Sequence, residues 1–241
     1  MDRHQRWRRP SDVAVIQSEA GGGTASGRRS AARFATEAAG NFVLVFAFAV
    51  AIATHSWFSP LLVGVPLVAM VYSGTRVPGG HYNPALSIAM LIRHRLAPRA
   101  ALAFWLVQSG AGLLAAVSVR AIIDPRQLAV TAAMTVKGPT LAAAFALELV
   151  LTCVLCCVAL EVSTHNSHAV DDYYAWPIAF SVIAGAVVIG AITNGAFDPT
   201  VSLDDALLAI ISWPTLWVYL VSQLLSGIAA TITFVSIADH H

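Results

Sequence analysis

The chain carries few charged residues, and this scarcity excludes a soluble globular protein. Of its 241 residues, 11% are Asp, Glu, Lys or Arg, while 57% are hydrophobic. A soluble domain has about a quarter charged residues, because its surface must be hydrated. The mean hydropathy of +0.71 agrees with this reasoning. The composition therefore predicts an integral membrane protein.

Cysteine is scarce as well. Cys153, Cys156 and Cys157 form a C-x-x-C-C pattern inside one apolar run. Free cysteine in such a run behaves as a small hydrophobe, so we expect neither a disulfide framework nor a metal site. The sequence also lacks a phosphate-binding Gly-rich loop and a nucleophile–base pair. We therefore expect no enzyme and no cofactor.

The basic residues gather near one end of the chain. Seven arginines precede the first apolar run, six within residues 1–32, which are rich in Gly, Ser and Ala, and one at Arg33. Without a hydrophobic pattern this segment is expected to be a disordered cytoplasmic tail, followed by a membrane domain over 33–241. An arginine-rich tail also suits nucleic acid, but the positive-inside rule explains it better, so no nucleic-acid partner is expected.

Apolar length predicts the membrane segments, since the hydrocarbon core needs about 20 helical residues. Two shorter pieces, 84–92 and 199–211, are nearer half a span and suit re-entrant helices. Six longer runs are predicted to cross: 33–55, 58–75, 100–122, 140–162, 174–193 and 207–236.

A count of basic residues orients these spans. With a cytoplasmic amino terminus and six crossings, eleven of the fourteen Lys and Arg residues lie on the cytoplasmic side. This asymmetry follows the positive-inside rule. We therefore expect a multi-pass cell-membrane protein with both termini in the cytoplasm.

Two stretches near the half-spans resemble each other: GGHYNPALS, residues 79–87, and NGAFDPTVS, residues 194–202. A glutamine follows each motif at the same distance, 25 residues after Asn83 and after Asp198, and a glycine follows each glutamine four residues on. An early glutamate precedes each motif. These shared offsets predict two copies of one unit, at about 33–122 and 140–237. The landmarks are Glu37, Gln108 and Gly112 in the first copy, and Glu148, Gln223 and Gly227 in the second.

Three spans per unit make the repeat inverted, because an odd number brings the second copy in from the opposite face. The two half-helices then meet near the midplane by their positively polarised amino termini. Irregular backbone at that depth is tolerated only against protein or a water-filled cavity. The architecture is therefore a pore or a binding site.

The two motifs differ chemically. Asn83 can cap a helix through its carbonyl while its NH₂ group donates into the lumen, and Pro84 suits the first helical position. Asp198 can still cap, but an ionised carboxylate only accepts hydrogen bonds. If charged, it would also offset the two helix ends, which together contribute about +1. The pore-motif residues are Asn83, Pro84, Ala85, Asp198, Pro199 and Thr200.

These landmarks, in this order, resemble the aquaporin and glycerol-facilitator family, also called major intrinsic proteins. The resemblance rests on TEAAGNFVLVF, GGHYNPALS, ALELVLT, ITNGAFDP and WVYLV, and it covers almost all of the chain after residue 33. It implies an all-α membrane fold with six transmembrane helices and two re-entrant half-helices. It also implies a homotetramer with one pore per subunit, and loop-supporting roles for Glu37 and Glu148.

The resemblance further implies a selectivity filter on the extracellular side. The family places an arginine three residues after the second motif's first residue, where this chain has Val201. The other positions carried over by offset are Val63, Ala186 and Gly195. All four are small or apolar, so we expect a wide, apolar constriction. It would pass small uncharged solutes such as glycerol- or urea-like polyols and amides, with water as a possible co-substrate. Membrane lipids are the other expected partners.

Other interpretations stay open at this point. Asp198, the missing arginine and a wet acidic mouth at Asp204 and Asp205 would suit a cation- or proton-leaky channel, whose proton flux Asp198→Asn would abolish. The degenerate second motif would also suit a non-conducting scaffold or sensor.

Overall fold

A computed structural model describes residues 23–54, 57–74, 79–124, 126, 139–164 and 174–238. Within these ranges the regular structure is helical. Six long helices are α2 (Gly23–Thr54), α3 (Ser59–Gly74), α5 (Pro98–Ile122), α7 (Pro139–Thr164), α8 (Ala175–Thr193) and α10 (Leu216–Ala238). Two nine-residue helices, α4 (Pro84–Ile92) and α9 (Pro199–Leu207), and a 3₁₀ turn, η2 (Trp213–Thr215), complete the described fold.

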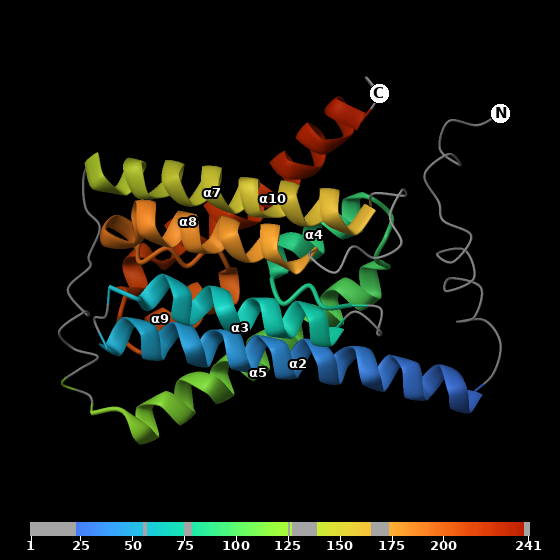
Figure 1. Cartoon of the computed structure of the whole chain (residues 1–241), viewed down its shortest axis with the longest axis horizontal. Helices are drawn as coiled ribbons and strands as arrows, with labels where there is room; N and C mark the ends of the chain where they lie inside the picture. Colours follow the sequence, from blue (N-terminus) through green and yellow to red (C-terminus); the bar gives the residue numbers. More distant parts are fainter. Residues whose placement is uncertain are drawn as a thin grey trace.

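The long helices form a bundle, and the two short helices lie inside its length (Figure 1). In that view α4 lies toward the end of the bundle where α2 begins, and α9 lies toward the other end. The start of α2 and the end of α10 are at the same end of the bundle. The short helices therefore enter from opposite ends, as the inverted repeat predicts.

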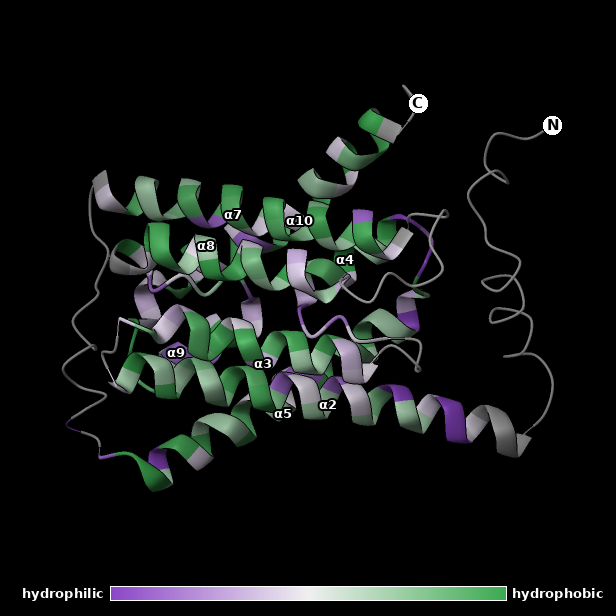
Figure 2. Cartoon of the chain, viewed as in Figure 1, coloured by the Kyte–Doolittle hydropathy of each residue, from purple (hydrophilic) through white to green (hydrophobic). Residues whose placement is uncertain are grey.

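The distribution of side chains is that of a protein in lipid. Figure 2 shows hydrophobic colouring over most of the helical surface, with hydrophilic segments near the start of α2. On α5, Leu102 and Leu106 are 58% and 68% exposed, whereas Gln108 is fully buried. Water would favour the reverse, while a hydrocarbon solvent favours apolar groups outside and hydrogen-bonded polar groups inside.

Helix length supports the same conclusion. Four helical segments are long and apolar enough to cross a membrane: 27–54, 98–122, 140–163 and 213–237. The segments Ser59–Gly74 and Ala175–Gly190 are shorter apolar helices. The architecture is six membrane helices with two re-entrant half-helices.

The two half-helices end in the same way, which strengthens the evidence for a repeat. The residues eleven positions after each cap, His94 and Ala209, both have a left-handed backbone, with φ of 55° and 60°. The next N–H reaches back in each case, from Arg95 to the Met90 carbonyl at 2.9 Å and from Ile210 to the Asp205 carbonyl at 2.7 Å. Equal turns at equal offsets give both half-helices one geometry.

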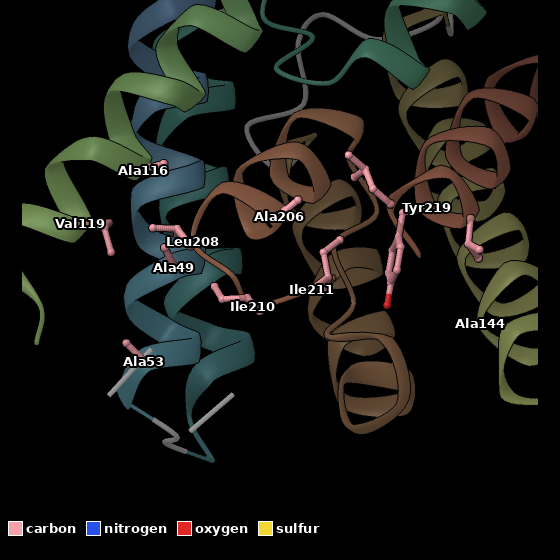
Figure 3. Packing of buried hydrophobic residues seen from close by; sticks show 12 residues of the cluster. Ala49, Ala53, Ala116, Val119, Ala144, Ala206, Leu208, Ile210, Ile211 and Tyr219 are labelled. Carbon is pink, nitrogen blue, oxygen red and sulfur yellow. The ribbon is translucent and has the colours of Figure 1, made fainter. Parts of the chain in front are cut away.

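The largest buried cluster holds α9 and the segment after it in place. Figure 3 shows Leu208 beside Ala49 of α2, with Ala53, Ala116 and Val119 around the same segment. Ile211 lies on the other side, toward Tyr219 of α10. Small residues on α2 and α5 let the returning chain pack closely against both helices.

Three predicted boundaries are wrong. The second half-helix, predicted over 199–211, is α9 and ends at Leu207. Helix α2 begins at Gly23, so residues 23–32 extend the first helix instead of forming part of a disordered tail; residues 1–22 lie outside the described ranges. The sixth span begins at Leu216, because α9 ends at Leu207, Ala209 reverses the chain direction and Pro214 lies in η2. The apolar run from 207 hid this break.

Each half-helix packs against a glycine on the third membrane helix of the other repeat. A Cβ at Gly227 of α10 would overlap the Ala85 carbonyl oxygen, and one at Gly112 of α5 would overlap the Asp204 carboxylate. These two glycines, at equivalent positions in the two repeats, thus let the helices approach each other closely.

We predict that Gly227→Ala destabilises the protein by about 1–3 kcal/mol or more, because the new methyl group meets backbone that cannot rotate away. Gly110→Ala, on α5, is the matched control. Its Cβ would meet no atom within 4 Å, and alanine favours a helix by about 1 kcal/mol. The stability of both variants is measured as the thermal unfolding midpoint in detergent, monitored by size-exclusion chromatography. Equal midpoints for Gly227→Ala and wild type would contradict the packing argument.

Candidate functional site

Both half-helices begin with the capping geometry expected from their sequences. Asn83 precedes α4 with an extended backbone, and its Oδ1 accepts the Ala85 N–H at 2.7 Å. Asp198 precedes α9 with nearly the same backbone, and its Oδ1 accepts the Thr200 N–H at 2.7 Å. Proline occupies the first helical position in each case. Exchange of Asn for Asp therefore preserves the helix start.

The loop before α4 is held by Glu37 of α2. Its two carboxylate oxygens accept backbone N–H groups, one from His81 at 2.8 Å and one from Tyr82 at 2.9 Å. The amide Nε2 of Gln108 donates to the same carboxylate at 2.9 Å. Tyr82 has φ of 51°, a left-handed conformation that turns its N–H toward the glutamate. The hydrogen bonds to Glu37 stabilise this otherwise unfavourable conformation.

The loop before α9 repeats this arrangement with Glu148 of α7. The carboxylate accepts the Phe197 N–H at 3.2 Å and the Gln223 amide at 2.9 Å. Phe197 has φ of 52°, matching Tyr82 of the first loop. Glu37, Glu148 and both glutamines are fully buried. These contacts form the loop-supporting arrangement that the family resemblance implies.

The two loops are also joined directly. The Asn83 Nδ2 donates to the Phe197 carbonyl at 2.8 Å, across the contact between the repeats. One of the amide's two N–H groups is therefore used within the protein, and at most one is left for a solute. The expectation that the whole NH₂ group faces the lumen is corrected to this extent.

Asn41, a residue that the sequence analysis did not single out, completes the junction. Its Nδ2 donates to the Tyr82 carbonyl at 3.0 Å and to the Thr200 hydroxyl oxygen at 3.1 Å. The Thr200 hydroxyl donates in turn to the Asp198 carboxylate at 2.6 Å. A polar residue one helical turn after Glu37, on the same face of an apolar span, was the available signal.

Thr193 was also missed. Its hydroxyl donates to Glu148 at 2.6 Å and accepts the Gly195 N–H at 3.2 Å, so it links the glutamate to the loop that carries Gly195. Thr193 is fully buried at the end of α8, where a hydroxyl needs a partner. Only its position shortly before the second motif hinted at this contact.

The four positions assigned to a filter come together. Val63 and Val201 belong to one apolar cluster, and Val63 and Ala186 pack against another. The Ala186 Cα lies 3.3 Å from where a Cβ of Gly195 would be. The side chains at this point of the fold are thus small and apolar, drawn from α3, α8, the second loop and α9.

Asp204 and Asp205 do not form a wet acidic mouth. Each is 2% exposed, and both lie on α9 within the bundle. The Asp204 carboxylate packs on the Gly112 backbone of α5. The expected vestibule of carboxylates is therefore wrong, because helix packing covers these residues.

Comparison with known proteins agrees with this geometry. A family model described as Major intrinsic protein matches residues 25–234. "Glycerol uptake facilitator protein-like 6" from Lactiplantibacillus plantarum is 28% identical over 82% of this chain and 94% of its own length. "Aquaporin NIP1-4" from Oryza sativa subsp. japonica is 29% identical over 69% of this chain, which spans 59% of the rice protein.

A solved structure shares the fold. The aquaglyceroporin from Plasmodium falciparum superposes with a TM-score of 0.67, covering 85% of this chain and 95% of that chain. Sequence identity is 18%, so this likeness concerns the fold alone.

The cap at Asp198 gives a prediction with an internal control. Asp198→Asn keeps a carbonyl acceptor for the Thr200 N–H, so we expect wild-type stability. Asp198→Ala removes the acceptor and is expected to cost about 0.5–2 kcal/mol. Thermal midpoints of both variants in one detergent provide the measurement. A loss in Asp198→Asn as large as in Asp198→Ala would show that the negative charge, and not the cap, stabilises α9.

Proposed function

We propose, since the chain belongs to the major intrinsic protein family, that it is a passive transmembrane channel for small uncharged solutes such as glycerol- or urea-like polyols and amides, and water. The observation that carries the proposal is the junction of two oppositely entering half-helices beside four small or apolar residues. The sequence relative from Lactiplantibacillus plantarum, a glycerol uptake facilitator-like protein, supports a solute of glycerol size.

The junction suits an uncharged solute. Two helix amino termini present positive partial charge, which disfavours cations, while Asn83 retains one N–H for a passing hydroxyl. The Asp198 carboxylate offsets part of this field but is itself bonded by the Thr200 N–H and hydroxyl. An ion would have to lose its hydration shell beside Val63 and Val201, which offer no polar replacement.

The same topology supports the remaining parts of the proposal. The start of α2 and the end of α10 share one end of the bundle, and the arginine-rich end is assigned to the cytoplasm of a cell membrane. A homotetramer with one pore per subunit follows from the family resemblance.

The missing arginine provides the functional test. We predict that Val201→Arg lowers glycerol permeability by about tenfold, because a long guanidinium side chain narrows an opening otherwise lined by small groups. Val201→Thr, which is uncharged and no longer than valine, narrows the opening no further and should stay within about twofold of wild type. Stopped-flow light scattering of proteoliposomes in an inward glycerol gradient measures re-swelling.

Equal amounts of each variant must be inserted for this comparison. Wild-type vesicles that re-swell no faster than empty liposomes would contradict glycerol conduction. Wild-type flux that Val201→Arg leaves unchanged would instead contradict the place assigned to residue 201 in the pore. A proton flux that vanishes in Asp198→Asn would favour the leaky-channel interpretation.

A further inference from the structure

A pocket of about 480 Å³ opens on the bundle surface between the beginnings of α2 and α5. None of its lining residues belongs to the half-helix junction, and no step of the proposed conduction uses it. Its lining combines Ser30, Arg33 and Phe34 of α2 with Pro98, Arg99 and Ala100 of α5.

The pocket is suited to a negative group. Two arginines line it, one from each helix. The wall also contains the first turn of α5, a 25-residue helix whose cap residue, Ala97, has no side-chain oxygen to offer. The N–H groups of Arg99 and Ala100 therefore have no acceptor within the helix, and the helix dipole adds about half a positive charge.

The cationic wall is held in place by a buried aromatic residue. Phe104 of α5 is fully buried, and its ring contacts Phe34 edge-on with a centroid separation of 5.8 Å. The Arg33 guanidinium carbon lies 5.3 Å from the same ring centroid. A guanidinium stacked in this way loses less freedom when it binds an anion.

The surroundings distinguish a lipid from a soluble anion. The pocket lies where the apolar run of α2 begins, at the expected boundary between lipid head groups and hydrocarbon. Leu102 and Leu106 follow Pro98 at successive turns of α5 and are exposed on its outer surface. This stripe continues from the pocket toward the membrane interior, so acyl chains can lie along it while a phosphate occupies the pocket.

We propose that this pocket binds the phosphate group of an anionic diacyl phospholipid in the leaflet that faces the start of α2. Arg33, Arg99 and the first turn of α5 bind the phosphate oxygens, and the leucine stripe contacts an acyl chain. Among the residues that the structure describes, the pocket lining includes no carboxylate, so a cationic choline head group finds no counter-charge from them. Phosphatidylglycerol is therefore bound more tightly than phosphatidylcholine.

Native mass spectrometry of the full chain, titrated with dioleoyl phosphatidylglycerol or dioleoyl phosphatidylcholine, tests this proposal. Loss of two arginines at a lipid surface should weaken binding of phosphatidylglycerol by about 10- to 30-fold in Arg33→Gln/Arg99→Gln. Arg28→Gln/Arg29→Gln is the matched control. It removes equal charge from exposed positions of the same helix end that do not line the pocket, and should change binding by less than about threefold.

Arg33 also contacts Phe104, so Arg99→Gln alone keeps the test valid if the double variant does not fold. Arg99 is exposed, and its loss should weaken phosphatidylglycerol binding by about threefold or more. Equal losses in the two double variants would overturn the pocket in favour of diffuse surface charge, and so would equal binding of the two lipids. Glycerol 3-phosphate, which has no acyl chains, should fail to compete; effective competition would identify a soluble-anion site and overturn the lipid assignment.

Discussion

The fold depends on two buried carboxylates that bind backbone. Irregular loops cannot lie at membrane depth unless their N–H groups find acceptors, since each unsatisfied group costs several kcal/mol in hydrocarbon. Glu37 and Glu148 supply those acceptors. A glutamine on the third membrane helix of each repeat donates to each carboxylate and holds it in place. The loops can then turn through Tyr82 and Phe197, which aims both half-helices inward. Hydrogen bonds to charged groups stabilise by about 1.5–3 kcal/mol each, and both loops share this support.

The two halves match where they build the fold and diverge where they meet. Caps, left-handed residues and glycine contacts occur at the same offsets in both copies. At the junction the symmetry is broken, because the Asn83 amide donates across to the Phe197 carbonyl, while the Asp198 carboxylate accepts the N–H and hydroxyl of Thr200. Asn41 bridges the difference by bonding to both loops. The Thr200 hydroxyl and the Asn41 amide thus join Asp198 to the first loop.

Sequence reasoning predicted the architecture well because its signals are local and periodic. Apolar length, proline-led half-spans and equal spacings are properties of the chain itself, and they located α4 with its observed ends. The failures share a different cause. The start of α10 was missed because the apolar run 207–211 was joined to the sixth span, although Ser212 and Pro214 interrupt it and a backbone reversal at Ala209 breaks the helix. The burial of Asp204 depends on which helix lies opposite, and no local pattern encodes that. The spacing of Asn41 from Glu37 marked its face of the helix but not the partners that it binds.

The loops are supported by side chains other than those at the proposed filter positions. Glu148, Gln223 and Thr193 bond behind the second loop. Val201 lies on another side of α9, in an apolar cluster with Val63, and contributes nothing to that polar network. Replacement of a charged residue by valine at such a position removes a desolvation cost and leaves the supporting hydrogen bonds intact. Substitutions at residue 201 should therefore change solute permeability more than they change folding stability.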